Sequence, residues 1–207
     1  MKSLKKQVHY DGFVFQVTED VYEPAEDSFL VADYLAQVVK EDHVVLDVGT
    51  GCGIVAVVAA RKAKSVVATD INPHAVKCAK LNAKTNRANN KIDVRVGDLF
   101  KPIHKTEKFD LIVFNAPYLP TASSEQKTWI GRAWSGGPDG RQLIARFIHE
   151  APQYLARNGR ILLVQSSLAN VNETLKTFSE KGLETRVVAE KKFAFETIVV
   201  VEAKAFI

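Results

Sequence analysis

Short apolar strands alternate with helical segments along most of this chain, and this alternation narrows the fold more than any other feature. Residues 43–48, 65–69, 92–96, 109–114 and 160–165 are apolar and rich in β-branched side chains. Strands that are buried on both faces have this composition. Parallel strands need a crossover connection, usually a helix, so the pattern predicts a parallel sheet with helices on both faces.

The C-terminal part of the chain predicts two further strands, at 184–190 and 196–202. The turn between them is too short for a crossover, so this pair must be antiparallel. The expected fold class is α/β, Rossmann-like, with a seven-stranded, mostly parallel sheet whose last strand is antiparallel. Apolar spacing predicts helices at 26–39, 54–62, 73–85, 140–156 and 168–181, the fourth bent or interrupted near Pro152.

The segments outside this alternation are an N-terminal hairpin and a long loop. Residues 7–17 alternate around Asp11-Gly12, which is a hairpin signal. Residues 115–139 are rich in Pro, Gly and Ser and are expected to form a loop. We expect one domain over 1–207, made of an N-terminal hairpin and helix segment (1–42) and a Rossmann-like core (43–207).

Composition excludes several classes of protein. No apolar run approaches the roughly 18 residues that span a membrane, and residues 1–6 lack the apolar core of a signal peptide. Cys52 and Cys78 are too few for a disulfide framework, and five scattered histidines show no metal-ligand spacing. A cytoplasmic protein without a metal is expected. The 28 basic and 24 acidic residues leave a net charge of +4, which permits a nucleic-acid partner without requiring one.

A glycine loop, Asp47-Val48-Gly49-Thr50-Gly51-Cys52-Gly53, follows the first buried strand. Glycines permit a positive φ and let a ligand approach the backbone at a helix start. Asp70 ends the next strand, where a carboxylate can accept hydrogen bonds from both hydroxyls of a ribose. Ile54 stands where a dinucleotide fingerprint has its third glycine, and carboxylates suit a cation better than a diphosphate. A nucleoside with a positive charge is therefore expected; alternatively, the glycines only make a tight turn.

Asp98 and Leu99 follow the third buried strand at the same edge. An Asp after a strand is usually a turn former. Because ligands of open α/β sheets bind at the carboxyl ends of the strands, we expect Asp98 to accept the exocyclic amine of an adenine, with Leu99 beside the ring.

Asn115-Ala116-Pro117-Tyr118 directly follows the fourth buried strand. The nitrogen of an amide or aromatic amine is a poor nucleophile because its lone pair is delocalised. Two acceptors, the side-chain oxygen of Asn115 and the carbonyl of Ala116, can hold its NH₂ group and direct the lone pair toward a methyl donor. Pro117 restricts the backbone before it, and Tyr118 can stack on the planar group. Alternatively, the segment is an ordinary Asn-x-Pro turn.

Together these segments resemble class I S-adenosylmethionine methyltransferases, and more narrowly the archaeal and eukaryotic branch of the HemK-type glutamine N5-methyltransferases. Residues 21–30 (VYEPAEDSFL) resemble the family's N-terminal segment, 47–53 its cofactor loop, 115–120 its Asn-Pro-Pro-Tyr motif, and 133–141 its Trp-Gly-Gly loop. The resemblance implies S-adenosylmethionine as cofactor and 115–118 as catalytic residues. The implied cofactor-binding residues are Tyr22, Pro24, Ser28, Asp47, Gly49, Thr50, Gly51, Gly53, Asp70, Ile71, Asp98, Leu99 and Asn115.

The resemblance also implies a substrate and a partner. The substrate would be the glutamine of the Gly-Gly-Gln motif in a class I translation release factor, although some relatives are reported to act on histone lysine. The partner would be a small zinc-containing activator that pairs with an edge strand at 92–96. Trp129 and Trp134 either line the substrate entrance or anchor the long loop. Ala116 replaces the family's proline but keeps the backbone carbonyl, so we expect activity to persist with a looser catalytic loop. Alternatively, the enzyme is weakened or prefers another substrate.

Two other functions fit the same motifs. An adenine-N6 methyltransferase acting on DNA or RNA uses a similar Asn-Pro-Pro-Tyr segment, but it usually carries a target-recognition region. Only 1–42 and 115–139 lie outside the catalytic fold and could supply one. The other alternative is a non-catalytic cofactor-binding subunit, for which Ala116 is the only hint.

Overall fold

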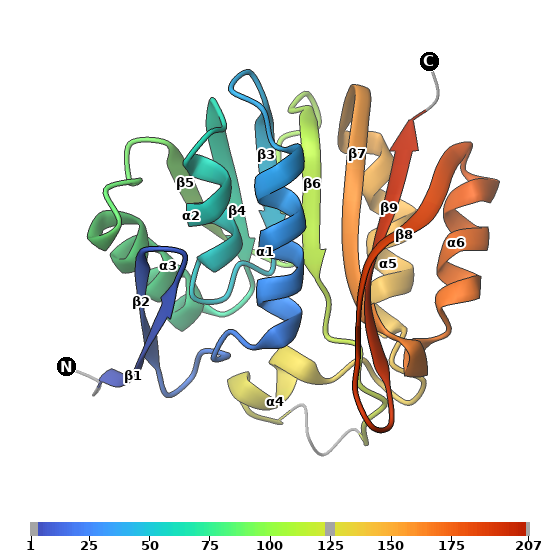
Figure 1. Cartoon of the computed structure of the whole chain (residues 1–207), viewed down its shortest axis with the longest axis horizontal. Coiled ribbons are helices and arrows are strands. Elements are labelled where there is room, and N and C mark those ends of the chain that lie inside the picture. Colours follow the sequence, from blue (N-terminus) through green and yellow to red (C-terminus); the bar gives the residue numbers. More distant parts are fainter. Residues whose placement is uncertain (1–3, 123–126, 206–207) are drawn as a thin grey trace.

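A computed structural model describes residues 4–122 and 127–205 of the chain (Figure 1). A seven-stranded sheet has the strand order β5-β4-β3-β6-β7-β9-β8. The five strands from β5 to β7 are parallel, and β9 runs antiparallel to both of its neighbours. The predicted sheet, with its antiparallel last strand, is confirmed.

The bounds of the elements follow the chain from hairpin to closing strand pair. The strands are β1 (Leu4–Tyr10), β2 (Phe13–Thr18), β3 (Val44–Val48), β4 (Ser65–Asp70), β5 (Ile92–Val96), β6 (Phe109–Asn115), β7 (Leu155–Ser166), β8 (Leu183–Lys192) and β9 (Thr197–Ala205). The helices are α1 (Glu26–Val38), α2 (Ile54–Ala60), α3 (Pro73–Thr85), α4 (Trp129–Trp134), α5 (Gln142–Glu150) and α6 (Val171–Glu180), with 3₁₀ turns η2 (Ala151–Tyr154) and η3 (Ser167–Ala169). Of these described helices, none is long and apolar enough to cross a membrane.

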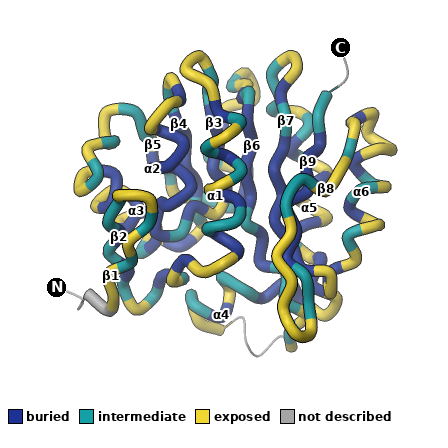
Figure 2. The backbone as a smooth tube through the Cα atoms, in the orientation of Figure 1, coloured by how far each residue is buried: buried dark blue, intermediate teal, exposed yellow. Residues whose placement is uncertain are grey.

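Two apolar layers cover the two faces of the sheet. Successive residues of a strand point to opposite faces, so Leu111 and Val113 of β6 pack under α1 and α2, whereas Ile112 and Phe114 pack under α5. Figure 2 shows the resulting buried centre between exposed helix surfaces. Because both faces are covered, the strands read as continuous apolar runs rather than as alternating ones.

The β1–β2 hairpin docks on α3 through two asparagine side chains. The amide of Asn82 accepts from the backbone N–H of Gln16 at 2.8 Å and donates to its carbonyl at 2.8 Å. Asn86 makes the same pair of bonds with Val14, at 3.0 and 2.9 Å. Asn82 also donates to the carbonyl of Cys52 at 2.8 Å. These side-chain amides thus pair with backbone N–H and C=O groups at the edge of the hairpin, and Asn82 connects the hairpin to the glycine loop.

Three sequence predictions need correction. The segment 115–139 is not a loop throughout, because α4 forms inside it under a cap from Thr128, whose Oγ1 accepts from the N–H of Gly131. The helix predicted for 140–156 is interrupted near Pro152 as expected, because α5 ends at Glu150 and the 3₁₀ turn η2 covers Ala151–Tyr154. The end of the predicted helix is wrong, however, since β7 begins at Leu155. The helix predicted for 168–181 is divided by Asn170, whose φ of 53° lies in the left-handed region.

Candidate functional site

Four acidic or amide side chains lie at, or just beyond, the carboxyl ends of neighbouring strands at one edge of the sheet. Asp47 lies near the end of β3, Asp70 is the last residue of β4, and Asn115 is the last residue of β6. Asp98 lies two residues beyond β5. Since these strands are adjacent and parallel, their carboxyl ends converge, which is where ligands of open α/β sheets bind.

A cavity of about 500 Å³ lies at this edge. The sequence-predicted residues that line it are Tyr22, Pro24, Ser28, Asp47, Gly49, Thr50, Gly51, Asp70, Ile71, Asp98, Leu99, Asn115, Ala116, Pro117 and Tyr118. Gly53 does not line the cavity. It begins α2 with a φ of 89°, and a Cβ there would lie 3.1 Å from Ala79, so this glycine serves the close packing of α2 on α3.

Asp70 holds the glycine loop in place. Its Oδ2 accepts from the N–H of Gly51 at 2.9 Å and its Oδ1 accepts from the N–H of Asn72 at 2.8 Å. Each carboxylate oxygen has a second lone pair, so both oxygens retain capacity for a ribose hydroxyl. Burial raises the pKa of Asp70 above its ordinary value, and the two backbone bonds oppose this rise.

Asp47 lies at the start of the glycine loop and is almost completely buried. Thr50 Oγ1 donates to its Oδ2 at 2.6 Å, and the side chain is 2% exposed. Burial raises the pKa of Asp47 to about 7, and the nearby charge of Asp70 adds to the rise. A carboxyl group whose ionised form is disfavoured in this way gains from a bound cation.

Asp98 lines the cavity but is already engaged by two cations. Arg146 on α5 lies 2.8 Å from its Oδ2, and Lys101 lies 3.0 Å from the same oxygen. These partners, Arg146 first, lower the pKa of Asp98. The carboxylate therefore stays ionised and keeps acceptor capacity on Oδ1 for an amine.

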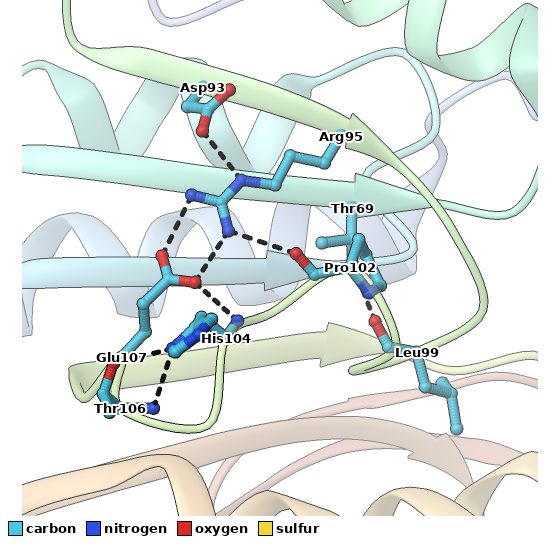
Figure 3. Close-up of polar contacts among 8 residues, drawn as sticks. All are labelled: Thr69, Asp93, Arg95, Leu99, Pro102, His104, Thr106 and Glu107. Carbon is cyan, nitrogen blue, oxygen red and sulfur yellow. Dashed lines mark hydrogen bonds and ion pairs between the residues drawn. The ribbon is translucent and has the colours of Figure 1, made fainter.

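Hydrogen bonds fix the segment 97–107, which follows β5 (Figure 3). Thr69 Oγ1 donates to the carbonyl of Leu99 at 3.3 Å, and Leu99 has a φ of 48°. The guanidinium of Arg95 donates to both oxygens of Glu107, at 2.8 and 2.9 Å, and to the carbonyl of Pro102 at 3.2 Å. The loop that carries Asp98 and Leu99 is thereby anchored at both ends.

Asn115 has a fixed amide orientation. Its Nδ2 donates to Oδ2 of Asp27 at 3.1 Å and to Oγ of Ser28 at 3.2 Å. Its Oδ1 is buried and has no hydrogen-bond partner among the described residues. A carboxylate only accepts hydrogen bonds, so the NH₂ group must face Asp27 and the carbonyl oxygen is left as a free acceptor.

The segment 133–141 supports the residues that follow Asn115. The N–H of Leu119 donates to the carbonyl of Trp134 at 3.0 Å, and the carbonyl of Leu119 accepts from Gly136 at 2.9 Å. Thr121 donates its N–H to the carbonyl of Gly137 at 2.9 Å. The Trp-Gly-Gly segment thus pairs with Leu119 and Thr121, just after Asn115–Tyr118, as a short backbone ladder.

Some lining residues were not predicted from the sequence. Asp27 is 6% exposed and lies at the centre of a hydrogen-bonded group, although the resemblance of its segment implied roles only for its neighbours. Arg132, whose guanidinium lies 4.9 Å from the ring centroid of Trp129, and Arg146 come from α4 and α5. Trp129 and Trp134 both line the cavity and are half-buried, so they belong to its wall.

The charges around the cavity favour a cationic ligand. Its wall carries four carboxylates, Asp27, Asp47, Asp70 and Asp98, against the two guanidinium groups of Arg132 and Arg146. A diphosphate would meet these carboxylates at close range, whereas a sulfonium or ammonium group would be attracted. In the described part of the chain, no three His, Cys, Asp or Glu side chains gather in a way that could hold a metal ion.

The known proteins that this chain resembles in sequence are methyltransferases. The family model of ribosomal protein L11 methyltransferases (PrmA) matches residues 29–117. A putative protein N5-glutamine methyltransferase of Methanocaldococcus jannaschii is 41% identical over 95% of this chain and 98% of its own length. The human methyltransferase HEMK2 is 36% identical over 88% of this chain and 89% of its own length.

A solved structure also resembles the chain. It belongs to the Mtq2–Trm112 complex of E. cuniculi, which is described as responsible for methylation of the translation termination factor eRF1. The likeness has a TM-score of 0.68 and 26% identity, and it covers 90% of this chain and 99% of the other.

Proposed function

Because this chain belongs to the HemK-type family of methyltransferases, we propose that it methylates the side-chain amide nitrogen of glutamine in the Gly-Gly-Gln motif of a class I translation release factor. The names of its relatives support this choice of substrate. The single observation that carries the reaction type is the free Oδ1 of Asn115, a buried acceptor beside Pro117 and Tyr118.

An acceptor of this kind suits a neutral NH₂ group. A buried acceptor without a partner costs about 1–3 kcal/mol, and a substrate N–H removes that cost. A second acceptor, the carbonyl of Ala116, would take the other N–H of the amide. With both hydrogens held, the nitrogen lone pair stands toward the methyl donor, and the Tyr118 ring covers the planar group from water. Orientation of this type lowers barriers by up to about 7–11 kcal/mol.

The proposed methyl donor is S-adenosylmethionine, which supplies an electrophilic methyl group on a positively charged sulfur. The chain's own residues fit it: Asp70 offers free lone pairs to a ribose, and Asp98 with Leu99 can hold an adenine. The buried Asp47 favours a nearby cation. S-adenosylmethionine would supply the methyl group and leave as S-adenosylhomocysteine. The amide nitrogen would form the new N–C bond and give up one proton to solvent.

The direct test is methyl transfer from labelled S-adenosylmethionine to a cognate class I release factor, mapped by peptide mass spectrometry. We expect one added methyl group on the Gly-Gly-Gln glutamine and a loss of about 10²–10³-fold in kcat for Asn115→Ala, as for removal of one oriented polar group. Plasmid DNA and transfer RNA are assayed in parallel. Label on nucleic acid alone would replace the proposal by the adenine-N6 reaction.

A small activator protein, zinc-containing as the family resemblance implies, is proposed to pair with the outer edge of β5. The structural neighbour from the Mtq2–Trm112 complex supports such a partner. β5 is first in the strand order, and within the described ranges no strand pairs with its outer side. The N–H of Val66 donates to the carbonyl of Lys91, and the N–H of Gly97 donates to the carbonyl of Asp70, so residues 91 and 97 direct their backbone groups toward β4. Because this direction alternates along a strand, the backbone N–H and C=O groups of residues 92, 94 and 96 face outward.

Val96→Pro tests this edge, because it removes an outward N–H at a residue that is 56% exposed. We expect loss of co-purification with the activator and an unchanged cofactor affinity. Val96→Ala keeps the N–H and should keep the partner. Equal binding of all three proteins would place the partner elsewhere.

A further inference from the structure

Asp27 is a buried charged residue of the site to which the proposed reaction assigns no role. It lies in the first turn of α1, a segment 88 residues before Asn115. Its carboxylate accepts from the N–H of Ser28 at 2.6 Å and from Nδ2 of Asn115 at 3.1 Å. The hydroxyls of Tyr118 and Tyr22 donate to it at 3.2 and 3.4 Å.

Every polar group around Asp27 is in a donating role. The two tyrosines stay protonated, because burial and then the charge of Asp27 raise the pKa of both Tyr22 and Tyr118. Oδ1 faces the backbone N–H of Ser28, while Oδ2 faces Asn115 and Tyr118. Both oxygens of the Asp27 side chain therefore face hydrogen-bond donors, and an ionised carboxylate can accept at both of them.

We propose that Asp27 is a positioning residue that fixes the amide of Asn115 with its oxygen free for the substrate, and that also sets the hydroxyl of Tyr118. The inference rests on the proposed function and deepens it, since it assigns the orientation of the catalytic acceptor to a charged group on another element. Without Asp27, the hydroxyl of Ser28 still contacts the Asn115 side chain. A hydroxyl can donate as well as accept, so it does not decide between the two amide orientations, which differ by exchange of oxygen and NH₂.

Asp27→Asn is the most informative change, because it replaces one carboxylate oxygen by NH₂ and keeps the shape of the side chain. The backbone N–H of Ser28 is a fixed donor, so the new amide turns its oxygen there and its NH₂ toward Asn115. Asn115 then turns its own oxygen toward that NH₂ group and presents its NH₂ to the substrate amide. The NH₂ groups of Asn115 and of the substrate then face each other, both as donors. The reaction loses one of its two acceptors, while the cavity keeps its shape.

The experiment compares wild type, Asp27→Asn, Asn115→Ala and the double variant on the release factor. We expect kcat to fall about 100-fold in each, with KM and the dissociation constant of S-adenosylmethionine changed less than about threefold. If Asp27 acts through Asn115, the double variant is no slower than Asn115→Ala. Wild-type kcat in Asp27→Asn, or losses that multiply in the double variant, would overturn the proposal.

A control and a second readout keep this test independent of the substrate. Asp33→Asn makes the same change on the exposed side of α1, where Asp33 accepts from Tyr10, and should leave kcat unchanged. The Asn115 side-chain amide signal, assigned by its loss in Asn115→Ala, is followed by ¹H–¹⁵N spectroscopy. It should be slow to exchange in wild type and shifted in Asp27→Asn. An unshifted signal contradicts the proposal even if wild type proves inactive on every release factor.

Discussion

Gly140 lies directly against the carbonyl of Tyr118: a Cβ added to Gly140 would be 2.3 Å from that oxygen. The φ of Gly140 is 75°, in the region that favours glycine. This contact joins the end of the Trp-Gly-Gly segment to the last residue of the segment Asn115–Tyr118, which is proposed to be catalytic. The position of Tyr118 therefore depends on a residue 22 positions later that has no side chain.

Gly140→Ala should move Tyr118 and destabilise the fold. We expect backbone strain and the clash together to lower the free energy of unfolding by about 3 kcal/mol or more, measured by urea denaturation. Gly182→Ala is the matched control, since Gly182 has a φ of 79° and nothing within 4 Å of the added Cβ. It should cost only about 1–2 kcal/mol. Equal losses in both variants would show that the contact with Tyr118 carries no energy.

Asp47 predicts a pH dependence of cofactor binding. Because burial raises its pKa to about 7, S-adenosylmethionine should bind with release of a proton near and below neutral pH. Its dissociation constant should rise up to about tenfold per pH unit below pH 7. Calorimetry in two buffers of different ionisation enthalpy counts the proton. Asp47→Asn should bind weakly at every pH, without proton release; a steep pH dependence in that variant would assign the effect to another group.

The same pKa shift affects stability in the opposite sense. The folded protein holds a proton on Asp47 that the unfolded chain has released between about pH 4 and 7. This contribution is fully present below the unfolded pKa and is lost as pH rises through about 7. Asp47→Asn should therefore stabilise the free protein most above pH 7. Thermal melts of both proteins across this pH range, without cofactor, measure the difference.

Asn82 should contribute more to stability than its neighbour Asn86 on α3. Asn82 is 0% exposed, and its side chain makes hydrogen bonds to both backbone groups of Gln16, to the carbonyl of Cys52 and, at 3.6 Å, to Sγ of Cys78. Asn82→Ala leaves these groups buried and unpaired, so a loss of about 2–4 kcal/mol is expected. Asn86→Ala, at a more exposed position, should cost about 1 kcal/mol. Hydrogen exchange at Gln16 locates the effect; unchanged protection there would contradict it.

Local patterns made the sheet and the glycine loop predictable. Buried β-branched runs marked the strands, and the helix at 73–85 was predicted with its observed bounds because Pro73 suits a first turn. By contrast, α4 has six residues with Gly131 inside and too little length to show a period. β7 begins at Leu155, before the predicted strand at 160–165, and includes Asn158, with a φ of 62°, and Gly159, which are residue types that strands disfavour. The secondary structure of both segments therefore depends on tertiary contacts rather than on local sequence patterns.

The candidate site divides in the same way. Residues at strand ends were predictable, because the carboxyl edge of a parallel sheet collects them. The role of Asp27 was not, because its partners Asn115 and Tyr118 lie 88 and 91 residues away. Arg146 likewise meets Asp98 across 48 residues. Within the glycine loop, Gly49 and Gly51 line the cavity, whereas Gly53 packs closely against Ala79, a difference that the motif alone does not reveal.

Ala116 provides the last test, because it stands where the resembling family has proline. Ala116 is 3% exposed and packs beside Phe114 in the apolar layer under α5. Proline would fix its φ and reduce the freedom of the unfolded chain. We expect Ala116→Pro to hold residues 115–118 more rigidly, to raise kcat, and to raise the free energy of unfolding by about 0.4–1 kcal/mol.

Thr121→Pro is a suitable contrast to Ala116→Pro, since the N–H of Thr121 donates to Gly137 and proline would remove that bond. It should lower kcat and stability together, which shows that the benefit is specific to position 116. Backbone order parameters at 115–118 report the rigidity directly. If Ala116→Pro is neither faster nor more ordered there, the backbone ladder to 133–141 already supplies the stiffness that proline gives the family, and Ala116 is not a weakness.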